Sequence, residues 1–379
     1  MKKKFLIVTT IPMSLNFFKG QIRYLSQEFD VQLVSGPGEE LKHISKAEGV
    51  SAHGVKMERE ISPIKDILSL CKLVLLFNKL KPYVVHGNTP KAGLLSMMAA
   101  WICGVPKRIY FIHGLRYEGA EGFKRILLLN MERLTCYFAN EVFTVSYGVK
   151  DKLKSDKITD KKIQINGNGS INGINANAFL PDVEQKQKYH LEQQLPENTI
   201  IFGFVGRIVR DKGINELVEA FLMLLQKHKN TKLLLVGDYE EELDPIDIAT
   251  KRAIEDNDKI ILTGWQKDIR PYLNLMDIFV LPSYREGFGI SIMEAAAMNI
   301  PAICSNISGC NEIIKDGYNG KLISPKSVGE LYEAMEIFID NPDLISQMGK
   351  VSRGYILNKY DQNFVWKESL KNYRELVSE

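Results

Sequence analysis

Two cations follow an apolar run in the second half of the chain. The run from Ile200 to Val205 has the composition of a buried strand, Gly206-Arg207 come directly after it, and Lys212 follows five residues after Arg207. A helix is expected to begin near Ile214. In open α/β sheets, ligands gather at the carboxyl ends of the strands, and two cations beside a glycine suit a diphosphate. Taken alone, the stretch also fits a solvated loop.

Two carboxylates form a second candidate stretch. Glu286 and Glu294 surround the glycines at positions 287 and 289, and a helix is expected to begin near Ile290. The first amides of such a helix, with its positive dipole end, would form an anion site for phosphate. A carboxylate accepts hydrogen bonds from two vicinal hydroxyls, so one glutamate suits a ribose and the other a transferred sugar. A helix-capping glutamate beside a solvated one is the alternative.

Together the two stretches resemble the retaining glycosyltransferases of family 4, which include bacterial capsule, lipopolysaccharide and mannosyl transferases of the two-lobed GT-B fold. Gly206-Arg207 through Lys212-Gly213 matches the family's GR-x4-KG stretch, and Glu286 to Glu294 matches its E-x7-E motif. The resemblance covers nearly the whole chain.

This resemblance implies specific roles in binding a nucleotide-sugar donor. It assigns Arg207 and Lys212 to the diphosphate, Glu294 to the ribose hydroxyls, and Glu286 to the donor sugar. Trp265, with Gly264, matches the segment that holds the base. A purely structural role, in which the Trp265 side chain packs against the protein, is an equal alternative. The implied donor-binding set is Gly206, Arg207, Lys212, Gly264, Trp265, Glu286, Gly287, Phe288, Gly289, Ile290 and Glu294.

The first half carries two histidine-containing stretches after apolar runs. His86-Gly-Asn-Thr-Pro-Lys-Ala-Gly resembles an H-x-H-T-P-K-A-G stretch of bacterial polysaccharide transferases, with Asn88 in place of the second histidine, which weakens any catalytic role there. The family places a histidine at His113, beside the donor phosphate and sugar, as a hydrogen-bond donor; a structural histidine is the alternative. The implied catalytic set is His113, Arg207, Lys212 and Glu286.

The loop after the first apolar run lacks the glycine pair that many family members carry. Its Ser14-Leu-Asn-Phe-Phe-Lys form resembles the capsule-type subgroup, in which the loop would shape the acceptor side. Leu15, Phe17 and Phe18 are expected to be exposed there. The predicted acceptor-side residues are Ser14, Phe17, Phe18, Lys19, Asn88 and Lys91.

The elements that must position these residues alternate regularly. Short β-branched runs and longer amphipathic runs, such as Ile64 to Leu80, alternate in both halves, which predicts two doubly wound parallel sheets. The fold class is therefore α/β, with two Rossmann-like lobes facing across a cleft that holds the active site. We expect an N-terminal acceptor-side lobe over residues 1–180, completed by a C-terminal helix at about 360–379, and a nucleotide-sugar-binding lobe over residues 181–359.

Composition and charge restrict the partners. The 379 residues include 45% hydrophobic and 25% charged side chains, as in ordinary globular proteins. Residues 1–178 hold 26 Lys and Arg against 15 Asp and Glu, while the rest hold 23 against 31. Basic amphipathic segments around Lys65, Lys72, Lys79 and Lys124-Arg125 could press onto anionic lipid, or could simply be core-facing helices with a solvated face. No stacking motif favours nucleic acid, and no apolar run is long enough to span a bilayer.

These patterns predict a hexosyl- or N-acetylhexosaminyltransferase. It would move a sugar from a UDP-sugar to an acceptor hydroxyl with retention. The acceptor would be a polyprenyl-diphosphate-linked saccharide of capsule or O-antigen synthesis, reached at the cytoplasmic face of the membrane. No DxD or His/Asp cluster suggests a metal, so no cofactor is expected. The alternatives are a same-fold transferase for a small soluble acceptor, a nucleotide-sugar epimerase, and a non-catalytic sugar-nucleotide-binding scaffold subunit. A dehydrogenase is disfavoured because no G-x-G-x-x-G follows the first strand.

Overall fold

The computed structural model describes residues 2–192, 194–196, 198–240 and 244–378. The chain divides into an N-terminal unit, Met1–Gly173 with Gln362–Glu379, and a C-terminal unit, Ile174–Asp361. The division after residue 173 precedes the predicted boundary at 180/181. The amide of Ile174 donates to the carbonyl oxygen of Tyr360 at 2.8 Å, and the amide of Asp182 donates to Asn274 Oδ1 at 2.7 Å. These bonds attach the segment before 181 to the C-terminal unit.

The N-terminal unit is built on a seven-stranded sheet in which all neighbouring strands are parallel. The strand order is β3-β2-β1-β4-β5-β6-β7. The order reverses between β1 and β4, and ligands of such sheets bind beyond the carboxyl ends of the strands at this reversal. The strands are β1 (Lys4–Val8), β2 (Asp30–Ser35), β3 (Ser51–Gly54), β4 (Val84–Asn88), β5 (Lys107–Ile112), β6 (Glu141–Thr144) and β7 (Ile163–Ile165).

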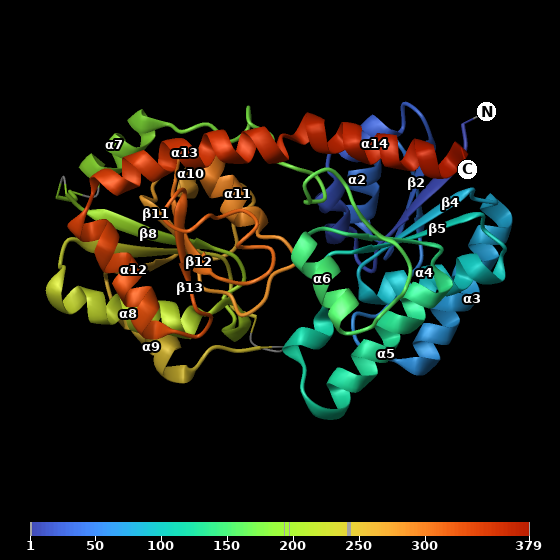
Figure 1. Cartoon of the computed structure of the whole chain (residues 1–379), viewed down its shortest axis with the longest axis horizontal. Helices are drawn as coiled ribbons and strands as arrows, with labels where there is room; N and C mark the ends of the chain where they lie inside the picture. The colour runs from blue at the N-terminus through green and yellow to red at the C-terminus, as the bar shows by residue number, and fades with distance from the viewer. Residues whose placement is uncertain (1, 193, 197, 241–243, 379) are drawn as a thin grey trace. The chain divides into compact units, whose positions relative to one another are not determined.

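Helices cover both faces of this sheet. Figure 1 shows α3, α4 and α5 on one face and α2 with the C-terminal helix α14 on the other. Their apolar sides and the inward sides of the strands form the core, which includes Leu6, Val85 and Phe77. The helices are η1 (Pro12–Phe18), α1 (Gln21–Leu25), α2 (Glu39–Glu48), α3 (Pro63–Leu80), α4 (Pro90–Ile102), η2 (Arg116–Gly119), α5 (Gly122–Phe138), α6 (Tyr147–Ser155) and α14 (Gln362–Ser378).

The C-terminal unit repeats this plan with six parallel strands in the order β10-β9-β8-β11-β12-β13. Its reversal lies between β8 and β11. The strands are β8 (Ile200–Val205), β9 (Thr231–Val236), β10 (Ile260–Leu262), β11 (Ile278–Leu281), β12 (Ala302–Ser305) and β13 (Gly320–Ile323). The helices are α7 (Val183–Glu192), η3 (Arg210–Lys212), α8 (Ile214–Lys227), α9 (Ile248–Asp256), α10 (Arg270–Leu273), α11 (Ile290–Ala297), α12 (Val328–Asp340) and α13 (Asp343–Tyr360).

The predicted fold class, two doubly wound parallel sheets, is confirmed. Helices begin at Ile214 and Ile290, as the sequence predicted. The pattern of apolar runs in the sequence did not predict the strands β3, β7 and β13. The edge strand β3 has the sequence Ser-Ala-His-Gly and no buried residue, so it lacks the apolar run by which a strand is recognised. No helix within the described ranges is long and apolar enough to cross a bilayer.

Candidate active site

In the C-terminal unit, the two predicted motifs meet where the strand order reverses. Lys212 lies in η3, after β8, and Glu286 lies in the loop after the neighbouring strand β11. The Lys212 ammonium forms an ion pair with Glu286 Oε1, which also accepts a hydrogen bond from Ser283 Oγ at 3.0 Å. Both charged side chains are largely buried. The sheet therefore brings a cation and a carboxylate together at its ligand-binding edge.

The backbone holds these two loops close together. Gly213 has φ +72°, and a Cβ atom there would overlap the carbonyl oxygen of Pro282, so the approach requires glycine. The amide of Tyr284 donates to the carbonyl oxygen of Asp211 at 2.8 Å. The Arg285 guanidinium forms an ion pair with the Asp211 carboxylate at 2.7 Å. These contacts fix the position of Lys212 relative to Glu286.

The glycine-rich segment before α11 presents backbone donors. The amide of Gly289 donates to the carbonyl oxygen of Gly309 at 3.0 Å. Within the described residues, the amides of Gly287 and Phe288 donate no hydrogen bond. They precede Ile290, the first residue of α11, where the positive end of the helix dipole lies. The segment can accept an anion or the oxygens of a sugar.

Glu294 lies one turn into α11, and its carboxyl group has no hydrogen-bond partner in the part of the chain that the structure describes. Burial raises the pKa of its carboxyl to about 8. A half-buried carboxyl without a partner is costly unless a ligand supplies hydrogen bonds. Its two oxygens suit a pair of hydroxyl donors.

Arg207, Gly264 and Trp265 lie at the same edge of the sheet, after β8 and β10. The Arg207 guanidinium contacts the carboxylate of Glu240, which follows β9. Gly264 forms a β-bridge with Gly237. Trp265 is 66% exposed, which excludes the packing alternative for this side chain. It offers a free ring at the protein surface.

In the N-terminal unit, the predicted histidine and asparagine meet at the ends of β4 and β5. Asn88 Nδ2 donates to the carbonyl oxygen of His86 at 3.0 Å and lies 3.4 Å from that of Val8. These two carbonyl oxygens fix the orientation of the Asn88 side-chain amide. If that amide were flipped, its oxygen would face both carbonyl oxygens and no hydrogen bond could form. Asn88 Oδ1 therefore faces His113 Nε2, at 2.9 Å.

This geometry selects one tautomer of His113. Because Asn88 Oδ1 can only accept, His113 Nε2 carries the proton. Burial lowers the pKa of His113 to about 3, so the ring is neutral and Nδ1 is an acceptor. Nδ1 is buried and has no partner in the described structure. The resemblance implied a donor at this position, whereas the neutral ring presents its donor to Asn88 and an acceptor elsewhere.

The hydrogen bonds continue away from His113 toward the C-terminal helix. Asn88 Nδ2 contacts His86 Nδ1 at 2.9 Å, and His86 Nε2 contacts the hydroxyl of Tyr373, on α14, at 3.0 Å. Burial and the nearby His113 lower the pKa of His86 to about 3. The C-terminal helix α14, which the sequence predicted to complete this unit, thus supplies the last group in a chain of hydrogen bonds between uncharged side chains.

The loop after β1 packs over His113. The rings of Phe17 and Phe18 lie 5.6 Å and 6.1 Å from the His113 ring. The expectation that Leu15 and Phe18 are exposed is wrong, since their exposed fractions are 0% and 2%. The loop forms the 3-10 helix η1, in which residues three apart share one face, so both point inward. Phe17 is exposed, as expected, and so is Lys19, while Ser14 is half-buried.

Lys91, also predicted on the acceptor side, is buried and attached to the loop before α3. It is 5% exposed, and its ammonium donates to Asp66 at 2.5 Å and to the carbonyl oxygen of Glu60 at 2.7 Å. It therefore holds the loop before α3 against α4. No local sequence pattern points to Tyr373, Glu240 or Ser283, because only the folding of the chain brings them into contact with the predicted residues.

The described residues contain no group of three or more His, Cys, Asp or Glu side chains that could hold a metal ion.

Comparison with known proteins adds independent information. Residues 185–354 match the family described as Glycosyl transferases group 1, and residues 12–146 match Glycosyl transferase 4-like. The capsular polysaccharide biosynthesis glycosyltransferase CapM of Staphylococcus aureus is 34% identical over 380 residues, which cover 100% of this chain and 98% of CapM.

Two further relatives are more distant. The UDP-Gal:alpha-D-GlcNAc-diphosphoundecaprenol alpha-1,3-galactosyltransferase of Escherichia coli is 28% identical, covering 80% of this chain and 78% of that enzyme. The crystal structure of Anabaena HepE in complex with UDP-glucose superposes with a TM-score of 0.81 at 16% identity, covering 98% of this chain and 99% of HepE. At that identity the likeness shows the shared GT-B fold alone.

Proposed function

Because this chain belongs to the family 4 glycosyltransferases, also described as group 1, we propose that it transfers a hexose or N-acetylhexosamine from a UDP-sugar to a lipid-linked saccharide. The acceptor would be a polyprenyl-diphosphate-linked sugar used in capsule or O-antigen synthesis. The names of CapM and of the Escherichia coli galactosyltransferase support this choice of pathway and acceptor.

The observation that carries the proposal is the meeting of Lys212 and Glu286 at the β8–β11 reversal. In the free protein each neutralises the other. A bound nucleotide sugar would share both groups, with Lys212 on the diphosphate and Glu286 on the sugar hydroxyls. The unpartnered amides of Gly287 and Phe288 and the start of α11 at Ile290 add donors for the same oxygens.

The rest of the donor fits the same edge of the sheet. Arg207 would bind the diphosphate by exchanging Glu240 for phosphate oxygens. Glu294, which lacks a partner, would accept hydrogen bonds from the two ribose hydroxyls. Gly264 and the exposed ring of Trp265 would hold the base.

The proposed reaction retains the configuration at the anomeric carbon. The acceptor hydroxyl oxygen bonds to that carbon on the face from which the diphosphate departs, as the bond between carbon and phosphate oxygen breaks. The hydroxyl proton passes to the departing phosphate oxygen. Arg207, Lys212 and the amides before α11 stabilise the charge on the leaving group. These fixed cations would take the place of a divalent ion, so we expect transfer without added metal.

His113 would orient a substrate hydroxyl in this reaction. Its Nδ1 atom is an acceptor without a partner, so it suits a hydroxyl that donates. The flanking Phe17 and Phe18 rings supply an apolar wall, and the adjacent Ser14 and Lys19 would contact the acceptor. This assignment gives the loop after β1 its proposed acceptor-side role.

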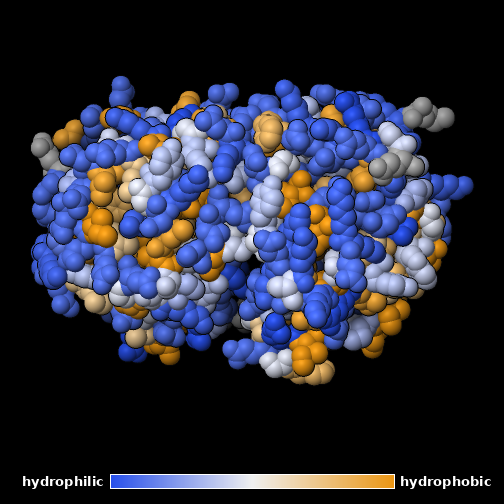
Figure 2. All heavy atoms as spheres, in the orientation of Figure 1, coloured by the Kyte–Doolittle hydropathy of each residue, from blue (hydrophilic) through white to orange (hydrophobic). Residues whose placement is uncertain are grey.

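A membrane-facing surface would deliver a lipid-linked acceptor. Large apolar side chains are exposed on α3 and α5, with Ile64 at 77% and Phe123 at 80%. Figure 2 shows apolar side chains gathered toward the lower right, where Figure 1 places these helices. Exposed lysines accompany them at positions 65, 72, 79 and 124. An apolar face with cations suits an anionic bilayer surface, so we expect peripheral binding at the cytoplasmic face.

The test is transfer from a panel of UDP-sugars to a synthetic prenyl-diphosphate-linked N-acetylhexosamine, with and without a metal chelator. We expect a product whose anomeric configuration matches the donor, formed equally in the chelator. Transfer only to small soluble sugars would identify the soluble-acceptor alternative. Interconversion of UDP-sugars without transfer would identify an epimerase, and UDP-sugar binding without turnover would identify a scaffold.

A further inference from the structure

The loop after β1 ends in a peptide group that is held from both sides. η1 ends at Phe18, and the peptide that joins Lys19 to Gly20 leads into α1. The carbonyl oxygen of Lys19 accepts a hydrogen bond from Asn172 Nδ2 at 3.0 Å. The amide of Gly20 donates to Glu48 Oε1 at 2.8 Å. Both hydrogen-bonding groups of this peptide therefore have side-chain partners from distant parts of the chain.

The orientation of this peptide distinguishes two types of β-turn. Lys19 has φ −53° and ψ 123°, and Gly20 has φ 80° and ψ −35°. These are the angles of the two central residues of a type II turn, which favours glycine in the second place. Rotating the peptide between them by roughly half a turn gives a type I turn, which the same two residues can also adopt. The hydrogen bonds to Asn172 and Glu48 hold the type II form.

The bond to Lys19 depends in turn on Trp366, in α14. Trp366 Nε1 donates to Asn172 Oδ1 at 2.6 Å. Because an indole nitrogen can only donate, the amide oxygen of Asn172 faces Trp366 and its nitrogen faces the Lys19 carbonyl. The Trp366 ring also packs on the turn, since a Cβ atom on Gly20 would lie 2.8 Å from Trp366 Cη2. Trp366 therefore orients the donor and fills the space beside the turn.

The held turn follows directly after the aromatic residues of η1. The Phe17 and Phe18 rings lie 5.6 Å and 6.1 Å from the His113 ring. Phe17 and Lys19 are exposed, on either side of the buried Phe18. The Lys19–Gly20 peptide fixes the C-terminal end of η1. Loss of its hydrogen bonds would therefore let these aromatic rings move relative to His113.

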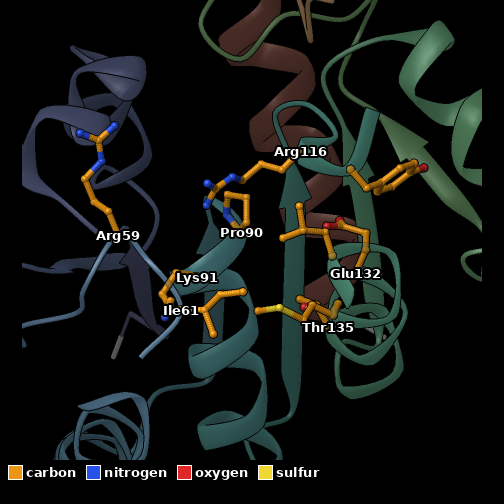
Figure 3. A pocket seen from close by; sticks show the side chains of 10 residues that line it. Arg59, Ile61, Pro90, Lys91, Arg116, Glu132 and Thr135 are labelled. Atoms are coloured by element: carbon orange, nitrogen blue, oxygen red, sulfur yellow. The ribbon is translucent and has the colours of Figure 1, made fainter. Parts of the chain in front are cut away.

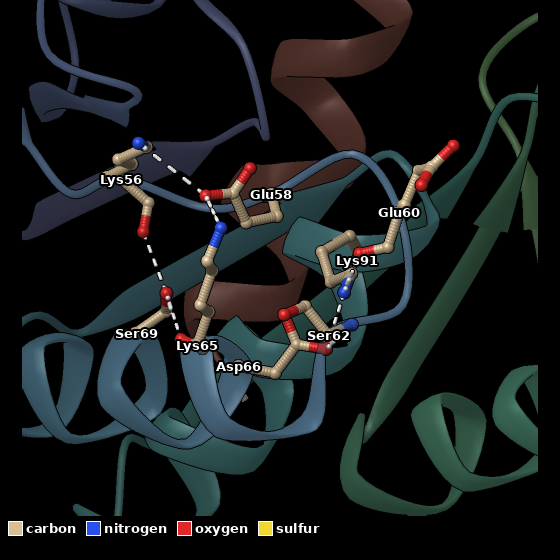
Figure 4. A network of polar contacts seen from close by, with 8 residues as sticks. All are labelled: Lys56, Glu58, Glu60, Ser62, Lys65, Asp66, Ser69 and Lys91. Carbon is tan, nitrogen blue, oxygen red and sulfur yellow. Dashed lines mark hydrogen bonds and ion pairs between the residues drawn. The ribbon is translucent and has the colours of Figure 1, made fainter.

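A second loop of this unit is fastened in a comparable way and offers a control. Figure 4 shows the segment before α3, where Ser69 Oγ donates to the carbonyl oxygen of Lys56 and Lys91 donates to that of Glu60, both at 2.7 Å. The cavity beside this segment, shown in Figure 3, has a volume of about 20 Å³, which holds about one water molecule. A sugar or a phosphate would not fit there, so this cavity is not a substrate site.

We propose that Asn172 and Trp366 are positioning residues for the acceptor. By holding the Lys19–Gly20 peptide in the type II form, they fix the end of η1, and with it the aromatic rings and the Lys19 side chain on the acceptor side. They act through the loop and not on the reacting atoms. The contact of this loop with the acceptor rests on the proposed function, whereas its attachment to Asn172 and Trp366 does not.

The first test compares Asn172→Ala with the control Ser69→Ala. Each variant removes a side chain that donates to a backbone carbonyl oxygen, that of Lys19 in the first and that of Lys56 in the second. With a prenyl-diphosphate-linked N-acetylhexosamine as acceptor, Asn172→Ala should raise the acceptor KM by about 3- to 10-fold, the effect of one or two lost hydrogen bonds. The UDP-sugar KM should stay unchanged. An unchanged acceptor KM, or an equal rise in Ser69→Ala, would overturn the proposal.

A double-variant cycle tests whether Trp366 acts through Asn172. Trp366→Phe keeps an aromatic ring and removes the Nε1 donor, so the Asn172 amide loses the bond that orients it. The acceptor KM should rise by about 3-fold. Asn172→Ala with Trp366→Phe should have the same acceptor KM as Asn172→Ala alone, because one chain of contacts is broken in both. Additive rises would show that the two residues act independently and would contradict the proposed link.

The third test observes the loop in the absence of both substrates. Ring currents from the two phenylalanines of η1 displace the NMR signals of the His113 ring, so a movement of the loop shifts them. Asn172→Ala and Trp366→Phe should shift the His113 Hε1 signal in the same direction, and the control variant should leave it in place. A raised acceptor KM with an unshifted His113 signal would show that Asn172 does not act through the loop. If the signal shifts as expected but the wild type glycosylates no prenyl-linked saccharide, the proposed function fails and the positioning of the loop stands.

Discussion

The ligand-binding edges of the two units have the same architecture and different chemistry. In the C-terminal unit the edge is charged, and each cation already contacts a carboxylate, Lys212 with Glu286 and Arg207 with Glu240. In the N-terminal unit the edge is neutral. There His113, Asn88 and His86 form a chain of hydrogen bonds between uncharged groups.

The difference indicates two ways of preparing a site. Paired charges can be redistributed when an anionic ligand enters, and in the free protein each pair costs less than an unpaired buried cation would. A neutral chain cannot supply charge, but it fixes the direction of each donor and acceptor. We therefore expect charge removal to damage the first site most, and loss of orientation to damage the second.

The largest effect should come from removing the cations of the charged edge. Arg207→Ala with Lys212→Ala should lower transfer by about a thousandfold or more, because each cation stabilises the leaving diphosphate. The fold should survive, since Arg207 lies on a loop and Lys212 ends the short 3-10 helix η3, outside the strands and the longer helices. The control Lys229→Ala with Arg252→Ala removes the same two residue types from exposed positions of the same unit. Near-normal turnover in the folded site variant would remove the diphosphate assignment.

A substitution at Gly213 should test the close contact between the loops after β8 and β11 without removing any charge. Gly213→Ala should destabilise the C-terminal unit by about 3 kcal/mol, because the new Cβ would overlap the Pro282 carbonyl in addition to the strain of a positive φ. Gly317→Ala is the matched control, since Gly317 has the same φ of +72° with open space around it. It should cost about 1 kcal/mol. Equal losses in urea unfolding would show that the two loops do not approach as described.

The neutral edge of the N-terminal unit should respond to a substitution that no longer fixes the orientation and tautomer of His113. Asn88→Leu removes the acceptor for His113 Nε2 and should lower kcat by about 10- to 100-fold, with UDP affinity unchanged. In the wild type, ¹⁵N NMR should show His113 with Nε2 protonated and Nδ1 unprotonated, and the variant should show a mixture of tautomers. A protonated Nδ1 in the neutral wild-type ring would contradict the assignment.

A smaller effect is expected from Tyr373→Phe at the far end of the same chain. It keeps the ring that packs on Phe5 and removes the hydroxyl that contacts His86. It should change kcat less than Asn88→Leu does. A larger loss would show that α14, rather than Asn88, orients the histidines.

The two edges should also respond oppositely to pH, by a few degrees in melting temperature. The folded pKa of Glu294, about 8, lies above the ordinary 4.5, so its ionisation reduces stability as pH rises between those values. The melting temperature of Glu294→Gln should therefore rise relative to that of the wild type from pH 5 to pH 8. The folded pKa of His113, about 3, lies below 6.5, so its protonation reduces stability as pH falls through that range. The melting temperature of His113→Gln should rise relative to that of the wild type as the pH falls. If the melting temperature of either variant followed the same pH dependence as the wild type, the pKa shift of the replaced residue would be contradicted.

The sequence predicted the charged edge better than the neutral one, for physical reasons. Strand Ile200–Val205 is a continuous apolar run and α11 follows a glycine-rich segment, so both could be placed from the residues. Charged residues at the ends of such elements are conspicuous, and Lys212 and Glu286 meet as the parallel-sheet rule requires.

At the neutral edge, direction matters more than residue type. Apolar residues at η1 gave no sign of which ones face inward, because the loop's 3-10 geometry buries Leu15 and Phe18 and leaves Phe17 outside. The link from His86 to Tyr373 joins residues that are 287 positions apart, which no local pattern reveals. Short polar edge strands such as β3 were missed because they bury no side chain.

The most direct test of the account is the thermal stability of the protein with nucleoside diphosphates and their sugars, without metal. A ligand that binds only the folded state raises its melting temperature. We expect a UDP-selective increase that is lost in Arg207→Ala with Lys212→Ala and kept in the Lys229→Ala with Arg252→Ala control. The absence of an increase with any nucleotide, or an equal increase in the site variant, would contradict donor binding at the charged edge of the C-terminal unit.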